Sequence, residues 1–263
     1  MDLDLAGKTA LITGGSAGIG LAIAEALAAE GCDLVLVSRD AEKLETAAAR
    51  VQALGTVVRT YAVDVGQDGS HSLLAERFPD VDILVNNAGS IPGGGLDKID
   101  QQKFRESWEL KVFGFIGMTR IFYDRMKARG AGVILNVIGA SGVRGDPAYI
   151  AGSVGNAALT SLTCNLGSEA PNYGLRVLGV SPGPVTTQRM EGVLRQQAAE
   201  RLGDETRWQE FGANFPFGRM AYPGEVASVA AFLVSPRAGY VSGTVLNIDA
   251  GMSERHEWWP APK

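Results

Sequence analysis

The glycine-rich segment near the N-terminus is the first part of the sequence that could do chemistry. It reads Thr13-Gly14-Gly15-Ser16-Ala17-Gly18-Ile19-Gly20 and stands between a short apolar run and a segment with apolar residues at helical spacing. Glycine lets the backbone turn sharply and approach a ligand, and the unpaired amides and dipole of a helix N-terminus favour negative charge. The spacing of Gly14, Gly18 and Gly20 therefore predicts a site for the phosphates of a dinucleotide.

The elements that must hold this turn in place alternate along the chain. Apolar runs that predict strands are separated by segments of helical pattern, such as 19–30 and 41–54. Runs that are apolar throughout are typical of strands buried on both faces. The sequence therefore predicts one parallel sheet with helices on both of its faces. The predicted strands cover residues 9–13, 33–38, 57–63, 81–86, 133–138, 175–181 and 244–248.

No linker, low-complexity run or repeat divides the chain, which predicts a single domain over 1–263. The segment 186–222 departs from the regular alternation, because a helical pattern over 189–202 leads into Trp208, Phe211, Phe215 and Phe217. It follows a strand end, where open α/β sheets bind their ligands. We expect a substrate lid over an apolar pocket there; a surface excursion with aromatic anchors is the alternative.

Composition excludes several classes of protein. The 263 residues carry 24 basic and 29 acidic side chains, a formal net charge of −5, and no basic stripe that would bind nucleic acid. Cys32 and Cys164 stand in apolar sequence, which favours a reducing compartment, and two histidines cannot form a zinc cluster. An acidic N-terminus and the lack of an apolar run of about 18 residues predict a cytoplasmic protein without a membrane span.

Short motifs stand at the ends of the predicted strands and at fixed places in the helices after them. In chain order they are 13–20, Asp64-Val65, Asn86-Asn87-Ala88-Gly89, Asn136, Tyr149, Pro182-Gly183-Pro184-Val185-Thr186-Thr187 and 218–226. With this order and spacing the sequence resembles the short-chain dehydrogenase/reductase family over nearly its whole length. The resemblance implies a single Rossmann-type doubly wound domain with a seven-stranded parallel sheet, a nicotinamide cofactor and a small-molecule substrate. It also implies a homodimer or homotetramer built on the helices around Lys111 and after Tyr149.

The cofactor choice depends on the end of the second predicted strand. A carboxylate there would bind ribose hydroxyls, whereas this chain has Ser38-Arg39, a hydroxyl and a guanidinium that suit a phosphate. NADP(H) is therefore preferred and NAD(H) is possible; the alternative for Arg39 is an ordinary surface arginine. With the family resemblance, the predicted cofactor-binding residues are Gly14, Ser16, Ala17, Gly18, Ile19, Gly20, Ser38, Arg39, Asp64, Val65, Asn87, Ala88, Gly89, Tyr149, Pro182, Gly183, Val185 and Thr187.

The catalytic pattern departs from the family. Relatives pair a tyrosine with a lysine four residues later, whose charge helps the phenol, with a pKa near 10 when free, to exchange a proton near neutral pH. Tyr149 is present, but Ser153 stands at the lysine position. Gly139 stands where the resemblance implies a serine, and Lys111 where it implies an asparagine.

Two explanations for this departure stay open. In the first, Lys111 brings an ammonium to Tyr149 and Ser141 supplies the lost hydroxyl, which makes the protein an NADP(H)-dependent oxidoreductase that interconverts a carbonyl and an alcohol on a small apolar substrate. In the second, the chain is a non-redox enzyme or a non-catalytic dinucleotide-binding protein. The catalytic candidates are Tyr149, Lys111, Ser141 and Ser153. The tail 252–263, with Trp258 and Trp259, is expected to cover a neighbouring subunit or a pocket mouth.

Overall fold

Seven parallel strands form one sheet, as the sequence predicts, in the order β3-β2-β1-β4-β5-β6-β7. The computed structural model describes residues 2–254, apart from the side chains of residues 200, 213 and 214. The strand order reverses between β1 and β4, which leaves a crevice at their carboxyl ends. The strands are β1 (Thr9–Thr13), β2 (Asp33–Ser38), β3 (Val58–Ala62), β4 (Ile83–Asn86), β5 (Gly132–Val137), β6 (Leu175–Pro182) and β7 (Val245–Ile248).

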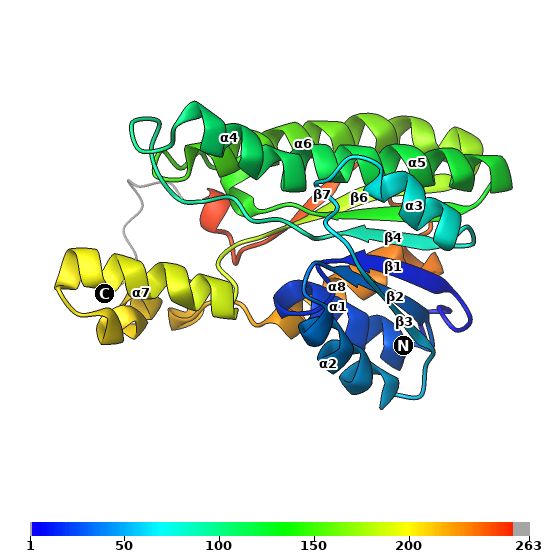
Figure 1. The fold of residues 1–263 in the computed structure, drawn as a ribbon, viewed down its shortest axis with the longest axis horizontal. Helices are drawn as coiled ribbons and strands as arrows, with labels where there is room; N and C mark the ends of the chain where they lie inside the picture. The colour runs from blue at the N-terminus through cyan, green and yellow to red at the C-terminus, as the bar shows by residue number, and fades with distance from the viewer. Residues whose placement is uncertain (1, 255–263) are drawn as a thin grey trace.

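Helices cover both faces of this sheet, and Figure 1 shows the two layers. Alternate residues of a strand point to opposite faces, so Ile12 packs with one layer and its neighbour Leu11 with the other. This confirms the predicted doubly wound domain. One layer contains α1 (Gly18–Ala29), α2 (Ala41–Gln52) and α8 (Pro223–Val234); the other contains α3 (Ser70–Arg77), α4 (Gln101–Trp108), α5 (Gly114–Arg129) and α6 (Ile150–Glu169).

A π-helical segment, η1 (Glu109–Phe113), joins α4 to α5 without a loop. A π turn adds a residue to the helical repeat and changes the direction of the side chains on it, and such turns are frequent at functional sites. Lys111 lies at the centre of this segment.

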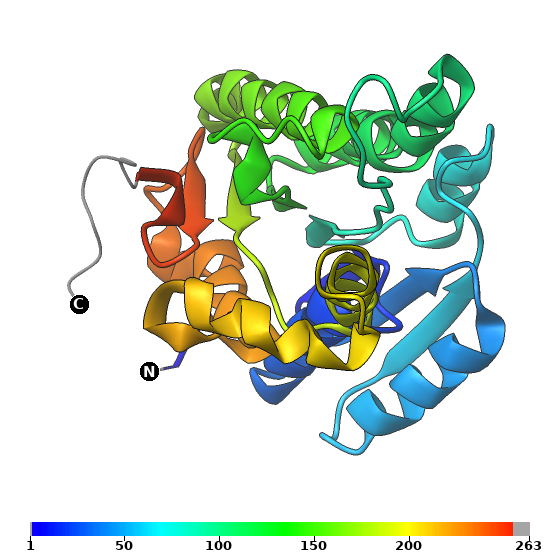
Figure 2. The same cartoon turned by 90° about the vertical axis from the view of Figure 1, so that its left-hand side faces the viewer.

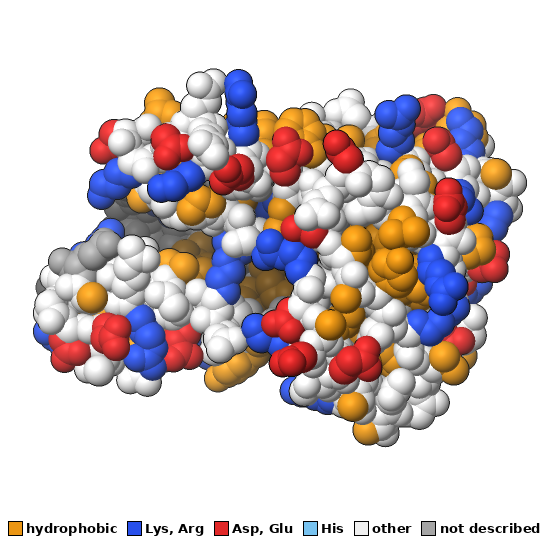
Figure 3. Space-filling model, in the orientation of Figure 1, with side chains coloured by type: hydrophobic (Ala, Val, Ile, Leu, Met, Phe, Trp, Pro, Cys, Tyr) orange, Lys and Arg blue, Asp and Glu red, His pale blue; other side chains and the backbone are white. Residues whose placement is uncertain are grey.

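The segment predicted to be a lid extends from the main body at the end of β6, as Figures 1 and 2 show. It begins with α7 (Gln188–Leu202), which confirms the predicted helix, and continues through the short helices η4 (Glu205–Asn214) and η5 (Pro216–Gly218). Thr186 N–H donates to the Ala221 carbonyl at 2.8 Å, so the segment leaves and rejoins the body at one place. Figure 3 shows a hollow between this segment and the layer of α4 and α6.

No helix among residues 2–254 is long and apolar enough to cross a membrane. Within the same range, no three His, Cys, Asp or Glu residues are grouped in a way that could hold a metal ion. Trp258 and Trp259 lie outside the described residues, and the role of the tail stays a prediction.

Candidate active site

The turn between β1 and α1 is closed tightly, and only glycine fits at its contact points. A Cβ built on Gly20 would overlap the carbonyl oxygen of Gly14. One built on Gly14, where φ is +68°, would lie 2.8 Å from Nδ2 of Asn87 and 3.1 Å from Cα of Ala88. The N-cap of α1 is Ala17, whose side chain caps no amide, so the first-turn amides are available to an anion. The turn therefore fits the pyrophosphate of a dinucleotide.

The loop after β4 is fastened to this turn by hydrogen bonds. Oγ1 of Thr13 accepts from the amides of Asn87 and Ala88, each at 3.0 Å, and Nδ2 of Asn87 donates to the Thr13 carbonyl at 3.0 Å. The predicted residues Asn87 and Ala88 thus lie against the glycine-rich turn. Gly89 is the next residue of the same loop.

Ser38 and Arg39 lie at the carboxyl end of β2, where the sequence places them. Oγ of Ser38 donates to the Asp40 carbonyl at 3.3 Å, and Nη1 of Arg39 lies 3.6 Å from Oδ2 of Asp64. Arg39 and Asp64 both line a hollow of about 330 Å³ at this edge of the sheet, and the Arg39 side chain is 63% exposed. The guanidinium is therefore accessible, but an aspartate already faces it.

Residues at the end of β6 connect the crevice to the lid. Val185 forms a β-bridge with Ala221, and Oγ1 of Thr187 accepts from the amide of Met190 at 3.2 Å, which caps α7. A Cβ built on Gly18 would lie 3.3 Å from Cγ2 of Thr187. The lid helix therefore starts beside the glycine-rich turn, close to Pro182 and Gly183 in the chain.

Lys111 reaches across the crevice from η1. Its side chain passes over Gly89, where an added Cβ would lie 2.8 Å from Cδ of the lysine, and Nζ donates to the Ile138 carbonyl at 2.6 Å. Burial, aided by the positive charge of Arg189, lowers the pKa of Lys111 to about 7. Burial at this position therefore favours the neutral amine.

Tyr149 precedes the first turn of α6, with its ring lying over Gly152, where a Cβ would overlap the ring carbons. The ring packs in an apolar cluster with Ile91 and Trp108. Burial raises the pKa of the Tyr149 phenol above its ordinary value, and the positive charge of Arg189 offsets only part of this increase.

Arg189 was not among the predicted site residues. It is the second residue of α7, and its guanidinium donates through Nη1 to the Gly89 carbonyl at 2.9 Å and through Nη2 to the Ile91 carbonyl at 2.8 Å. It also affects the pKa values of both Lys111 and Tyr149. The sequence contains one signal for it, a basic residue two positions after the motif that ends at Thr187.

The two predicted serines have other partners. Oγ of Ser153 accepts from the amide of Asp146 at 3.2 Å and donates to the carbonyl of the same residue at 3.4 Å, so it holds the loop before Tyr149. Oγ of Ser141 accepts from Nδ2 of Asn156 at 2.8 Å. A Cβ built on Gly139 would lie 2.9 Å from that same nitrogen. The amide of Asn156, which sequence reasoning missed, thus fills the space beside Gly139.

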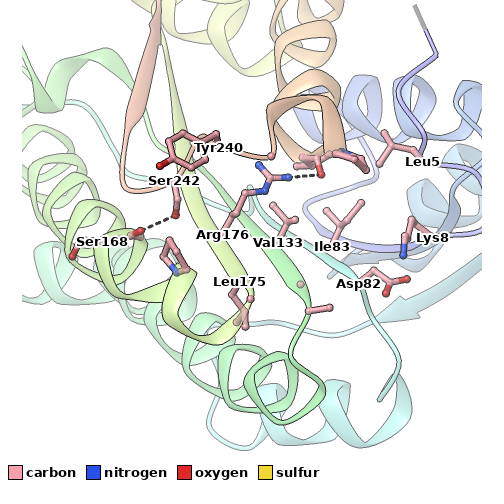
Figure 4. A pocket seen from close by; sticks show the side chains of 18 residues that line it. Leu5, Lys8, Asp82, Ile83, Val133, Ser168, Leu175, Arg176, Tyr240 and Ser242 are labelled. Atoms are coloured by element: carbon pink, nitrogen blue, oxygen red, sulfur yellow. Dashed lines mark hydrogen bonds between the residues drawn. The ribbon is translucent and has the colours of Figure 1, made fainter.

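A separate cavity of about 660 Å³ lies at the opposite, amino-terminal edge of the sheet, and Figure 4 shows its lining. Its wall includes Ile83, Val133 and Leu175, with Tyr240 at one side. The guanidinium of Arg176 is used there to bind carbonyls at the end of α8, including those of Leu233 and Val234 at 2.7 and 3.0 Å. That arrangement satisfies carbonyl groups at a helix terminus.

A parallel doubly wound sheet with a glycine-rich turn at its switch point defines a nucleotide-binding protein of the Rossmann type. Residues 14–253 match the family model described as enoyl-(acyl carrier protein) reductase. The chain belongs to the short-chain dehydrogenase/reductase family.

Similar proteins of known activity are oxidoreductases. The chain is 35% identical to the L-tagatose-forming galactitol 2-dehydrogenase of Cereibacter sphaeroides, covering 94% of this chain and 95% of the relative. It is 33% identical to the L-sorbose reductase of Gluconobacter frateurii solved with NADPH and L-sorbose, with a TM-score of 0.89 and coverage of 97% and 100%. It is 29% identical to a 7α-hydroxysteroid dehydrogenase solved with NADH and 7-oxo glycochenodeoxycholic acid, with a TM-score of 0.83 and coverage of 95% and 96%.

These likenesses and the fold make the protein an oxidoreductase that acts on CH–OH groups. The solved relatives hold NADPH or NADH, which supports a nicotinamide dinucleotide as the cofactor.

Proposed function

We propose that this protein interconverts a carbonyl and an alcohol on a small substrate, preferring NADP(H), with Tyr149 as the acid/base. The observation that carries the proposal is that three side chains contact the loop after β4. Lys111 passes over Gly89, Arg189 donates to the carbonyls of Gly89 and Ile91, and Tyr149 packs in the apolar cluster of Ile91. A phenol held at the edge where an open α/β sheet binds its ligand suits proton exchange with a substrate oxygen.

The residues present fit the cofactor. The glycine-rich turn would hold the pyrophosphate, Asp64 and Val65 the adenine, and Val185 and Thr187 the nicotinamide end. When bound, the nicotinamide ring supplies or accepts the hydride. The chain's own part is to orient the substrate, to exclude water with the lid, and to exchange the proton at the Tyr149 hydroxyl.

The NADP(H) preference is supported by Ser38 and Arg39. The Arg39–Asp64 pair at 3.6 Å is largely exposed on the arginine side, and exposed pairs contribute only about 0–1 kcal/mol. A doubly charged 2′-phosphate would therefore compete successfully for the guanidinium.

The replaced catalytic set is part of the proposal. With Ser153 at the family's lysine position and Gly139 at its serine position, the chain needs another cation for the phenol and another donor for the substrate oxygen. Lys111 is the residue that the sequence predicts for the first role, although burial lowers its pKa to about 7 and so favours the neutral amine. Ser141 is the predicted hydroxyl, and Asn156 is the side chain that positions it.

We also infer that the chain forms a homodimer or homotetramer through the helices around Lys111 and after Tyr149. The large apolar side chains Phe113, Ile116 and Val154 are exposed by 49%, 38% and 44% on η1, α5 and α6. A second copy of the chain would remove them from water. Light scattering of the purified protein tests this, and a monomeric mass at working concentration would contradict it.

The test of the function is a turnover screen with the full chain. NADPH or NADH is incubated with L-sorbose, a 7-oxo bile acid and simple apolar ketones, and the corresponding alcohols are incubated with the oxidised cofactors, while nicotinamide absorbance is followed. We expect oxidation of NADPH with at least one carbonyl, and weaker activity with NADH. Tight cofactor binding without turnover on the whole panel would instead favour the non-redox enzyme or the binding protein.

A further inference from the structure

Arg189, at the start of the lid, hydrogen-bonds to the Ile91 carbonyl, and the side chain of Ile91 belongs to the apolar cluster against which Tyr149 packs. We propose that Arg189 is the residue that positions a fixed positive charge for the Tyr149 phenolate, so that the lid helix itself supplies what the family's lysine supplies elsewhere. The catalytic consequence rests on the proposed function, whereas the effect on the phenol does not depend on turnover.

The position of the guanidinium is fixed by the backbone. Its two terminal nitrogens each donate to a carbonyl of the loop after β4, at 2.9 Å to Gly89 and 2.8 Å to Ile91. Ile91 packs in the same apolar cluster as Tyr149. Two hydrogen bonds from one planar group define its orientation as well as its location, which a lysine could not do.

Lys111 is a poorer source of fixed charge. Nζ already donates to the Ile138 carbonyl at 2.6 Å, at the end of β5. Burial favours the neutral amine, because an ammonium loses its hydration there. A guanidinium keeps its proton at every pH at which the protein is folded.

Arg189 belongs to the lid, so the position of its positive charge depends on the position of the lid. It belongs to the first turn of α7, whose start is capped by Thr187 and tied at 186 to the Ala221 carbonyl. The contacts to Gly89 and Ile91 therefore span from the lid to the sheet across the crevice. The phenol receives its cation only when the start of α7 lies against the loop after β4.

The experiment measures the ionisation of Tyr149 directly. The full chain is labelled with 3-fluorotyrosine, which titrates at lower pH than tyrosine, and the ¹⁹F resonance of residue 149 is assigned by its loss in Tyr149→Phe. Titrations compare wild type, Arg189→Met, Arg189→Lys and Lys111→Met. Arg201→Met, an exposed arginine near the end of the same helix, is the matched control.

We expect Arg189→Met to raise the ionisation midpoint of residue 149 by about 1 pH unit or more. Arg189→Lys should restore part of the shift, and Arg201→Met should leave the midpoint unchanged. An unchanged midpoint in Arg189→Met, or a larger rise in Lys111→Met, would overturn the proposal.

Where the turnover screen finds a substrate, the pH profile of kcat for alcohol oxidation gives a second measurement. Tyr149 acts as the base in that direction, so the lower midpoint should rise in Arg189→Met with little change in KM. Turnover that is insensitive to Arg189 would contradict this inference and leave the function standing. If the ionisation midpoint of residue 149 shifts in Arg189→Met but no substrate is turned over, the inference stands and the proposed function is contradicted.

Discussion

The aromatic ring of Tyr149 lies directly over Gly152, three residues further along the chain, where any Cβ would overlap the ring. Glycine inside a helix costs about 1 kcal/mol relative to alanine. Gly152 is nevertheless at a buried position of α6, because the absence of a side chain there leaves the space that the Tyr149 ring occupies.

Gly152→Ala should therefore move the phenol away from Arg189 while leaving the fold intact. We expect turnover to fall at least about tenfold, because a displaced acid/base loses alignment with the substrate oxygen. The free energy of unfolding should change little, since helix propensity offsets part of the steric cost. Denaturant unfolding and steady-state kinetics measure both effects. Gly224→Ala, in the first turn of α8 with nothing within 4 Å of its added Cβ, is the control. Equal activity in both variants would show that the ring position does not matter.

Lys111 should make the stability of the fold depend on pH. Its pKa falls from 10.5 in the unfolded chain to about 7 in the folded one, so between these values the unfolded chain binds more protons. The free energy of unfolding therefore rises with pH across that window. The cost of burying the Lys111 ammonium is fully present below about pH 7. Lys111→Met lacks this contribution. As pH increases from 7 to 10, we expect the Tm of wild type to increase relative to the Tm of Lys111→Met. Parallel curves for the two proteins would show that Lys111 keeps an ordinary pKa.

Arg39 should decide which dinucleotide binds more tightly. Arg39→Asp replaces the guanidinium with a carboxylate that repels a 2′-phosphate and accepts from ribose hydroxyls. We expect the Kd of NADPH to increase at least about tenfold, close to 1.4 kcal/mol, and that of NADH to decrease. Fluorescence titration of both cofactors gives the ratio. Lys43→Ala, which removes an exposed cation paired with Asp40 on the next helix, should leave the ratio unchanged. An unaltered ratio in Arg39→Asp would remove the basis for the NADP(H) preference.

The sheet and the glycine-rich turn follow from the sequence because their signals are local. The apolar runs end at the strand ends, and Gly14, Gly18 and Gly20 stand between β1 and α1 where the contacts exclude a Cβ. The prediction of 57–63 as a strand was slightly too long, since β3 covers Val58–Ala62, a short edge strand with partly exposed residues.

The arrangement of the catalytic candidates could not be predicted in the same way. Lys111 lies in a helix, as its sequence context predicts, but the π turn around it has no signature in residue types. Arg189 is 40 residues from Tyr149 in the chain, and it reaches Ile91, next to Tyr149, because the lid starts at the end of β6. Ser153 was expected near the phenol, whereas its hydroxyl binds the backbone of Asp146, a contact made by the loop before Tyr149.

The central claim, that Tyr149 exchanges the proton in carbonyl–alcohol interconversion, is tested most directly by the turnover of Tyr149→Phe. The variant removes one hydroxyl and keeps the ring over Gly152, and Tyr240→Phe, on a fully exposed tyrosine beside the distant cavity, is its control. With the carbonyl substrate found in the screen, kcat of Tyr149→Phe should fall about 10²-fold or more while NADPH binds as in wild type. A Tyr149→Phe variant that turns over at the rate of wild type and of Tyr240→Phe would contradict the assignment.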